Sequence, residues 1–299
     1  MDVESLSAWP APAKLNLFLH VVGRRADGYH LLQTVFQLLD IGDTVRLRVR
    51  DDARIERLNP LTGVPPEQDL CVRAARLLQQ EARCSAGVDI ALEKRIPMGG
   101  GLGGGSSDAA TVLLALNQLW NLHWPLTRLA QLALRLGADV PVFIHGENAW
   151  AEGVGERLTK LELPPQHYVV ICPGISVPTA QIFADPELTR STPPITIRDF
   201  LAGRGRNDLE PVARRRFPAV DALLGWLGQF GNARMTGSGA SVFLPVRDSA
   251  AAQAVLAAFG RDRPLATTDA QTGSVAFSAQ GVSRHPLHRS LNLPCQLAE

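Results

Sequence analysis

Apolar and polar residues alternate with a period of two near the start of the chain. Over residues 13–22 every second position is apolar, and the positions between them hold Lys14, Asn16, Phe18 and His20. This spacing predicts a β-strand. The turn signal Asp27-Gly28 separates it from a second strand over residues 31–39, so the two strands are predicted to form a β-hairpin whose tip is Arg24–His30.

Helical spacing of apolar residues marks three longer segments. It predicts helices over residues 69–83 and 107–120, and a third that Pro125 opens and Gly137 ends. Alternating or short apolar runs predict strands at residues 45–49, 88–92, 140–144 and 168–172 and after Arg234. Further helices are predicted near residues 207–229 and over 249–259.

The length of the chain suits two domains. With 299 residues and 45% hydrophobic content, it can bury one large or two medium cores. The pairs Pro164-Pro165 and Pro193-Pro194 mark breaks in the pattern. We therefore predict domains at residues 1–160 and 161–299, with no internal repeat.

Net charge and hydropathy exclude some function classes. A net charge of +1 gives no strong electrostatic attraction to nucleic acid. No stretch approaches the ~18 apolar residues of a membrane span, and no basic apolar leader opens the chain. We expect a soluble, cytoplasmic protein without nucleic-acid or membrane partners.

Cysteines and histidines give no metal pattern. Cys71, Cys84, Cys172 and Cys295 are scattered without a Cys-x-x-Cys pair, which is compatible with reduced thiols in a cytosol. The pair His285-x-x-His288 lies in a polar tail, and we expect it to be solvated rather than metal-binding.

A glycine-rich loop immediately precedes the helix at 107–120. Its residues are Pro97, Met98, Gly99, Gly100, Gly101, Leu102, Gly103, Gly104, Gly105, Ser106 and Ser107. A loop with few side chains at a helix N-terminus presents backbone N–H groups and a positive dipole end to one point, where a phosphate can bind. We expect Ser106 or Ser107 to cap the helix through a side-chain oxygen. Asp108 then lies in the first turn, where its negative charge interacts favourably with the helix dipole. These features favour a nucleotide site over a flexible linker.

The loop does not match the commonest phosphate-binding motifs. It lacks the Gly-Lys-Ser/Thr of a P-loop. The spacing Gly99-x-Gly101-x-x-Gly104 satisfies the dinucleotide fingerprint, but no ribose-binding acid follows about 20 residues later. Protein kinases place a valine where this chain has Ser106.

Among the charged residues, Lys14 and Asp139 are the best candidates for a role in catalysis. Lys14 lies in mid-strand between apolar neighbours, and Asn16 shares its face, so this strand could form one wall of a site. Asp139 precedes the apolar run 140–144, where it is either a helix-end hydrogen-bond acceptor or a base. Phosphoryl transfer to an alcohol would use a carboxylate to accept the proton and a lysine to hold developing charge.

The pattern Pro-x-x-x-Gly-Leu-Gly-x-x-Ser-Ser-x-Ala-Ala, from Pro97 to Ala110, resembles the ATP loop of the GHMP small-molecule kinases. The resemblance implies an α+β chain with a ribosomal-protein-like N-terminal domain, a ferredoxin-like C-terminal domain, and a site in the cleft between them. It also implies that residues 97–107 bind ATP. Mg²⁺ is expected from the chemistry, but the sequence indicates no ligand for it.

Four further stretches narrow the resemblance to the GHMP kinases that phosphorylate the 2-hydroxyl of 4-diphosphocytidyl-2-C-methyl-D-erythritol in non-mevalonate isoprenoid biosynthesis. They are Pro12-Ala13-Lys14-Leu15-Asn16-Leu17, Arg24-x-x-Asp27-Gly28-Tyr29-His30-x-Leu32, Gly137-Ala138-Asp139-Val140-Pro141 and Ala151-Glu152-Gly153-Val154-Gly155-Glu156. The resemblance implies that Lys14 and Asp139 are the catalytic pair. The likeness runs from about residue 12 to 288.

The same resemblance implies a set of substrate-binding residues, namely Asn16, Tyr29, His30, Thr179, Phe183, Gly237 and Ser238. Rings at the hairpin tip suit a cytosine, because they offer stacking faces and hydrogen-bonding edges. Phe183 matches the family's other cytosine-stacking position. Asn207-Asp208-Leu209-Glu210 also matches the family, but helix capping explains it and we leave it out of the site.

Two alternatives stay open at this point. One is another GHMP small-molecule kinase, which would lack the Asp27-Gly28-Tyr29-His30 tip. The other is a nucleotide-binding sensor of the same fold without turnover, which would be expected to lose Lys14 or Asp139. The expected quaternary structure is a monomer or weak homodimer.

Overall fold

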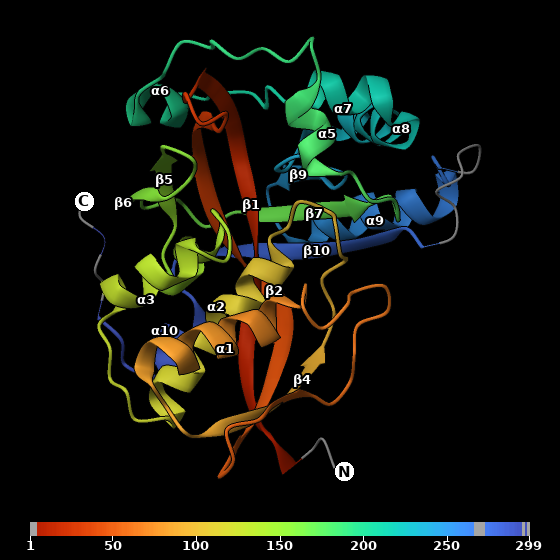
Figure 1. Cartoon of the computed structure of the whole chain (residues 1–299). Helices are drawn as coiled ribbons and strands as arrows, with labels where there is room; N and C mark the ends of the chain where they lie inside the picture. Colours follow the sequence, from red (N-terminus) through yellow and green to blue (C-terminus); the bar gives the residue numbers. More distant parts are fainter. Residues whose placement is uncertain (1–4, 266–272, 295–296, 298–299) are drawn as a thin grey trace.

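A long antiparallel hairpin is the centre of the fold (Figure 1). In this computed structural model, which describes residues 5–265, 273–294 and 297, the hairpin is formed by β1 (Ser7–Arg24) and β2 (His30–Arg50). The predicted hairpin is confirmed, and the run at 45–49 is the far end of β2 rather than a separate strand. The register shifts three times, between Pro12 and Lys14, Asn16 and Leu19, and Val21 and Gly23. Such irregularities redirect side chains along a strand.

One sheet joins both halves of the chain. Its main path runs β3-β4-β2-β10-β7-β9-β8, with β1 and β5 also paired to β2, and β6 to β5. The last strand in sequence, β10, pairs with β2 through Gly281 and Val282 and with β7 along the rest of its length. The bounds are β3 Ile55–Arg57, β4 Gly87–Glu93, β5 Ala149–Glu152, β6 Arg157–Lys160, β7 His167–Cys172, β8 Arg234–Met235, β9 Val242–Val246 and β10 Val275–Val282.

Helices of the N-terminal half pack on the hairpin and bury the larger core. Helix α2 (Gly104–Leu119) is almost fully buried and contacts α1 (Leu70–Ala82), α4 (Val140–His145) and β1. The helices predicted at 69–83 and 107–120 are confirmed. Pro125 is the N-cap of α3 (Leu126–Leu134) rather than its first residue.

The segment at 140–144 is a correction, since it forms the buried helix α4 and not a strand. A short apolar run is compatible with either a buried strand or a buried helix. Pro141 favours the helix here, because it lies in the first turn. At that position proline's fixed φ suits a helix, and its missing N–H removes no hydrogen bond.

The C-terminal half packs its helices around β7 and β9. The predicted strand at 168–172 and the helix at 249–259 are confirmed as β7 and α9 (Ser249–Asp262), and the helical region near 207–229 contains α7 (Glu210–Arg216) and α8 (Pro218–Leu227). The remaining elements are α5 (Thr179–Ala184), α6 (Ile197–Leu201), the 3-10 turn η2 (Gly228–Phe230) and α10 (Pro286–Ser290). No helix among the described residues is long and apolar enough to cross a membrane.

The histidine pair near the C-terminus is also a correction. His285 and His288 are fully buried, not solvated. His285 Nδ1 accepts the backbone N–H of Leu287 at the start of α10, and His288 Nε2 lies 2.8 Å from the carbonyl of Ile144 in α4. In the described part of the chain no cluster of three or more ligating side chains could hold a metal. The pair therefore docks α10 against α4, and Cys295 lies outside the described residues.

Burial of His285 makes stability depend on pH. Desolvation, followed by the nearby His288, lowers the pKa of His285 from 6.5 to about 3. The unfolded chain binds this proton near pH 6.5 and the folded chain does not, so stability is lost as the pH falls from 6.5 toward 4. One proton corresponds to about 1.4 kcal/mol per pH unit.

We predict that His285→Asn makes this acid destabilisation shallower, because asparagine keeps the helix cap and cannot titrate. The measurement is the free energy of unfolding by denaturant at several pH values between 4 and 7. His123→Asn, at an exposed histidine, is the control and should keep the wild-type slope. An unchanged slope in His285→Asn would show that this histidine is not the titrating group.

Candidate active site

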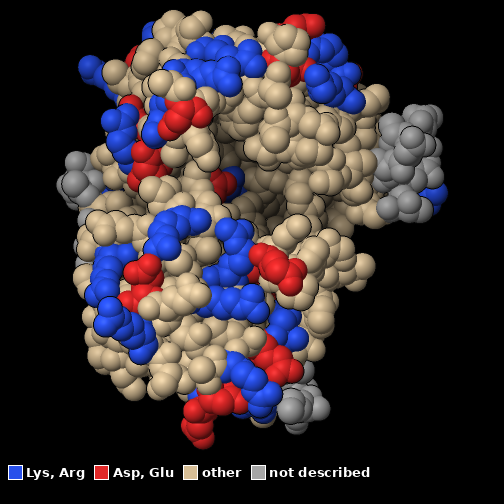
Figure 2. All heavy atoms as spheres, in the orientation of Figure 1, with Lys and Arg blue, Asp and Glu red and all other residues tan. Residues whose placement is uncertain are grey.

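A cavity of about 760 Å³ opens between the hairpin, the glycine-rich loop, the start of α4, α5 and the loop after β8. Figure 2 shows the hollow on the molecular surface. Most residues predicted for the site line this cavity, namely Lys14, Asn16, Tyr29, His30, Gly99, Gly101, Gly103, Ser106, Asp139, Thr179, Phe183, Gly237 and Ser238. The fold thus gathers segments from both halves of the chain at one place.

Lys14 is buried at the base of the cavity, with 2% of its side chain exposed. Its ammonium donates to Asn16 Oδ1 at 2.5 Å and to the carbonyl of Gly101 at 3.0 Å, and lies 3.2 Å from Asp139 Oδ2. Two of the three ammonium donors therefore have hydrogen-bond acceptors, and the Asp139 carboxylate pairs with the charge. A buried charge with this set of partners is compensated and held in one position.

Asp139 is the N-cap residue of α4, but its carboxylate does not cap the helix. Its side chain is 39% exposed and lines the cavity. Among the described residues, Lys14 is the partner of this carboxylate, through Oδ2. The other oxygen is therefore free to meet a ligand.

Asn16 links the lysine to both halves of the molecule. Its Nδ2 donates to Thr34 Oγ1 at 2.9 Å, and its backbone N–H donates to Thr236 Oγ1 at 2.9 Å. Thr34 in turn donates to the carbonyl of Phe18. Each polar atom in this buried chain has a partner, which holds Lys14 against rotation.

The glycine-rich loop depends on glycine at the positions closest to Lys14. Gly99, Gly101 and Gly103 have φ values of 71°, 77° and 73°, a region that side chains disfavour. A Cβ on Gly103 would come within 3.0 Å of Lys14 Cε, and one on Gly101 within 2.4 Å of the Thr236 carbonyl. Only bare backbone can pass between these neighbours.

The start of α2 differs from the sequence prediction. Gly103 is the N-cap, no side chain caps the helix, and both serines lie within the first turn. Ser107 is fully buried, while Ser106 lines the cavity. Because no hydroxyl occupies the helix end, its N–H groups stay available, as an anion site requires. Pro97, Met98, Gly100, Leu102, Gly104, Gly105 and Ser107 are not among the cavity-lining residues.

A buried ion cluster holds both ends of this loop. Lys94 Nζ contacts Asp43 Oδ2 and, at 3.0 Å, Asp108 Oδ2. Asp43 Oδ1 also accepts the backbone N–H groups of Arg95 and Ile96. Asp108 therefore anchors α2 to Lys94 rather than only facing the helix dipole.

Burial is the main cause that raises the pKa of Asp108, to about 7, with Lys94 opposing and Asp43 adding to the shift. The pKa of Lys94 is raised as well, because its two carboxylates outweigh the effect of burial. The cluster therefore keeps its lysine charged.

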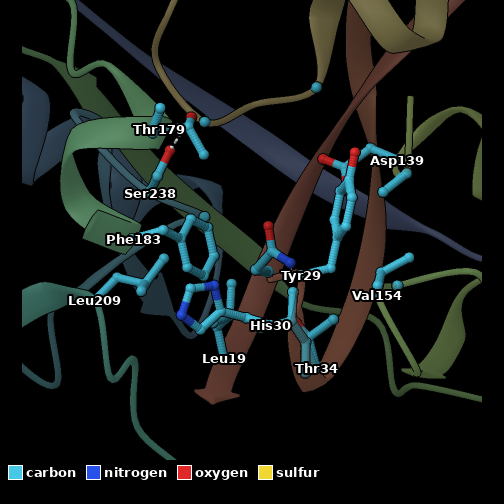
Figure 3. Close-up of a pocket in the computed structure, with 18 of the residues that line it drawn as sticks. Leu19, Tyr29, His30, Thr34, Asp139, Val154, Thr179, Phe183, Leu209 and Ser238 are labelled. Atoms are coloured by element: carbon cyan, nitrogen blue, oxygen red, sulfur yellow. Dashed lines mark hydrogen bonds between the residues drawn. The ribbon is translucent and has the colours of Figure 1, made fainter. Parts of the chain in front are cut away.

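The loop after β8, over residues 236–241, approaches the glycine-rich loop. The N–H of Ser241 donates to the carbonyl of Gly100 at 3.1 Å. Ser238 Oγ lies 2.7 Å from Thr179 Oγ1, which connects this loop to α5 (Figure 3). This loop thus joins the ATP-loop side of the cavity to the α5 side.

His30 and Phe183 form the aromatic part of the cavity. Their rings stack with centroids 4.9 Å apart and an interplanar angle of 30°. Tyr29 lies away from this pair, close to Asp139 and Val154 in Figure 3, and is 65% exposed. The three rings do not surround one empty slot.

Sequence reasoning missed several residues of this site. Thr34 and Leu209 line the cavity, and Asn207 Nδ2 donates to the carbonyls of Met235 and Gly237. Asn207 also makes the local turn that suggested capping, through Leu209 N–H, so its long-range role had no separate sequence signal. Arg190 was missed as well, and it contacts His30 Nε2 at 3.2 Å.

Comparison with known proteins places the chain in a family. The model for the GHMP kinases N terminal domain matches residues 69–147, and that for the GHMP kinases C terminal domain matches residues 193–263. A 4-diphosphocytidyl-2-C-methyl-D-erythritol kinase of Thiobacillus denitrificans is 61% identical over 281 residues, covering 94% of this chain and 97% of the relative. The kinase of that name from Dechloromonas aromatica is 56% identical, with 93% and 98% covered.

Solved structures agree with this placement. A crystal structure of 4-(cytidine 5'-diphospho)-2C-methyl-D-erythritol kinase matches with a TM-score of 0.73 and 36% identity, covering 92% of this chain and 100% of that one. Mevalonate kinase of Methanococcus jannaschii matches with a TM-score of 0.68 at 15% identity, covering 93% of this chain and 99% of that one, and shows the shared fold alone. The chain belongs to the GHMP kinase family, in its branch of 4-diphosphocytidyl-2-C-methyl-D-erythritol kinases.

Proposed function

We propose that this chain transfers the γ-phosphoryl group of ATP to the 2-hydroxyl of 4-diphosphocytidyl-2-C-methyl-D-erythritol, giving the 2-phosphate and ADP in non-mevalonate isoprenoid biosynthesis. The observation that carries the proposal is the Lys14–Asp139 pair at 3.2 Å, set beside a glycine loop in a cavity that also contains stacked rings. The family supports the same reaction.

The triphosphate binds at the glycine loop and the N-terminus of α2. Backbone N–H groups and the helix dipole attract phosphate oxygens there. Gly103 brings this backbone next to Lys14, so the γ-phosphate lies near the ammonium. The loop thus places the donor group at the catalytic pair.

Asp139 acts as the general base. Its free oxygen accepts the proton of the attacking hydroxyl, while Oδ2 remains held by Lys14. Lys14 keeps the carboxylate in position and compensates negative charge on the transferred phosphoryl group. A lysine without neighbouring acceptors could not be fixed this closely.

Magnesium is part of the proposal and fits the residues present. Mg²⁺ would be held mainly by phosphate oxygens and water, so it needs few protein ligands. The hydroxyl of Ser106, in the first turn of α2, is the protein group placed to reach it. When bound, the ion neutralises charge on the β and γ oxygens.

The cytosine binds on the side of His30 and Phe183. Because these rings already stack on each other at 4.9 Å, the base does not fit between them, and it lies beside the edge of His30 with its ring against Phe183. Thr179 and Ser238 lie near the same end of the cavity and offer hydroxyls to the diphosphate.

The alternatives are less well supported. A sensor without turnover has no need for a lysine that two hydrogen bonds hold beside Asp139. A GHMP kinase for another alcohol has no need for the stacked pair. We also propose a domain boundary near residue 160, a cytoplasmic location, no nucleic-acid or membrane partner, and a monomer or weak homodimer.

The test of the function is a coupled ADP-release assay with 4-diphosphocytidyl-2-C-methyl-D-erythritol against mevalonate, homoserine and galactose. We expect turnover with the diphosphocytidyl substrate and none above background with the other three. ATP binding without turnover of any substrate would support the sensor instead.

We predict that Asp139→Asn lowers kcat by ~10² or more, because the base is lost while the side-chain shape is kept. ATP affinity, measured by calorimetry, should not change. Asp51→Asn removes an exposed carboxylate outside the cavity and serves as the control. Near wild-type turnover in Asp139→Asn would leave this residue only a structural role.

We predict that Gly103→Ala weakens ATP binding about tenfold or more, since its Cβ would press on Lys14 and Phe143 at a φ of 73°. Gly63→Ala is the matched control, because this glycine also has a positive φ of 77° but lies outside the cavity, and its Cβ would meet nothing within 4 Å. Nucleotide titration measures both. Equal affinity in the two variants would contradict the assignment of the loop.

We predict that Phe183→Ala raises the KM for the diphosphocytidyl substrate about tenfold and leaves the KM for ATP nearly unchanged, since one stacking face is lost. Phe230→Ala, which removes an exposed ring that packs at a tilt against Trp226 outside the cavity, is the control. If both KM values rise together in Phe183→Ala, the damage is to the fold rather than to base stacking.

A further inference from the structure

Arg190 connects two walls of the cavity that are distant in sequence. Its Nε donates to His30 Nε2 at 3.2 Å, although the two residues are 160 positions apart. Its terminal nitrogens donate to three carbonyls in the segment that carries Phe183, at Leu188 (3.1 Å), Phe183 (2.9 Å) and Asp185 (2.7 Å). The guanidinium therefore has a fixed orientation when it meets the imidazole.

This contact determines which nitrogen of His30 carries the proton. A guanidinium has only donors, so Nε2 must offer its lone pair. Burial, the charge of Arg190 and the charge of Arg24 all lower the pKa of His30 below 6.5, which keeps the ring neutral at neutral pH. A neutral imidazole with an acceptor at Nε2 has its proton on Nδ1.

Nδ1–H is then the group that His30 offers to a ligand. Among the described residues no hydrogen-bond partner of Nδ1 is found, and His30 lines the cavity. The plane of the His30 ring is also fixed, because the ring stacks on Phe183 with centroids 4.9 Å apart. Figure 3 shows these two side chains facing each other.

A fixed donor can distinguish two pyrimidines. Cytosine presents ring nitrogen N3 as an acceptor on its pairing edge, whereas uracil presents N3–H, a donor. When a donor faces a donor, both groups stay unpaired. A site that hydrogen-bonds one group of its substrate therefore strongly rejects an analogue without that group. A histidine free to exchange tautomers would accept either base.

We propose that Arg190 is a positioning residue that fixes His30 as an Nδ1–H donor to cytosine, and so makes this site select cytidine over uridine. The inference rests on the proposed function, because it assumes that the base binds beside His30 and Phe183. Arg190 acts only through His30 and the segment 183–188.

The kinetic test compares 4-diphosphocytidyl-2-C-methyl-D-erythritol with the same compound carrying uracil. For wild type we expect kcat/KM to favour the cytidine form by about 10² or more. In Arg190→Met the ratio should fall about tenfold or more, through a higher KM for the cytidine form and gained activity on the uridine form, with the KM for ATP unchanged.

A matched control separates selectivity from general loosening of the segment. Arg215 pairs with Asp185 and Glu187 from the outside and does not contact His30. Arg215→Gln should therefore keep the wild-type ratio, and melting curves confirm that both variants are folded. A wild-type ratio in folded Arg190→Met, or an equal loss of ratio in Arg215→Gln, overturns the inference.

A second readout requires no turnover and no variant of Arg190. The ¹⁵N shifts of the imidazole nitrogens, assigned by comparison with His30→Gln, report which nitrogen is protonated in the wild-type chain. A proton on Nδ1 supports the inference, and a proton on Nε2 overturns it. If wild type phosphorylates neither substrate, the proposed function fails in the assay, while the tautomer is still decided by the spectrum.

Discussion

The site depends on the passage of bare backbone between Lys14 and the loop after β8. Gly101 and Gly103 both have positive φ, and a Cβ at either would meet atoms at 3.0 Å or less. This close approach lets the Gly101 carbonyl reach the ammonium of Lys14. It also brings the first loop against the second, where Ser241 donates to Gly100. Two segments about 140 residues apart in sequence therefore share one cavity because glycine allows backbone contact.

Lys14, which is buried, and Lys94, which is partly buried, illustrate how the environment assigns roles. Lys94 has two carboxylates, Asp43 and Asp108, whose side chains are 3% exposed or less. Lys14 has one, Asp139, which is 39% exposed. The first cluster is closed and can only brace the loop, whereas the second leaves a carboxylate oxygen open to a substrate. The charge of buried Lys14 is compensated, while the Asp139 carboxylate beside it is still open to the cavity. This difference is why we assign the reaction to Lys14 and Asp139 rather than to the Lys94 cluster.

Local patterns in the sequence predicted most helices and strands. They failed where contacts with another part of the chain determine the structure of a segment. The hairpin, α1, α2 and β7 follow from periodicity and capping residues. The run at 140–144 forms a helix because Pro141 fits its first turn and all five residues are buried. Ser106 and Ser107 do not cap α2, because the helix starts at Gly104 and both serines lie inside its first turn. His285 and His288 are buried by contact with α4, which no tail sequence reveals.

The candidate site shows the same division. Lys14, Asp139 and the glycine loop are separated by many residues, and their likeness to a family, rather than any spacing, indicated that they meet. Thr34, Asn207 and Arg190 carry no local signal, because each acts through a carbonyl or ring from another part of the chain. Polar residues that position others are found only when the fold is known.

Recognition and chemistry therefore use different parts of this molecule. In the proposed catalytic pair, Lys14 lies on β1 and is held by hydrogen bonds to Asn16 and to the Gly101 carbonyl, and Asp139 is the N-cap residue of α4, so a change there alters a fixed arrangement. The rings lie at the start of β2 and on the short helix α5, which are held to each other by one stacking contact and one arginine. Because few contacts hold these two segments together, this side of the cavity is easier to alter without unfolding the chain. Selectivity for the base can thus change independently of phosphoryl transfer, provided that Lys14 and the glycine loop keep their contact.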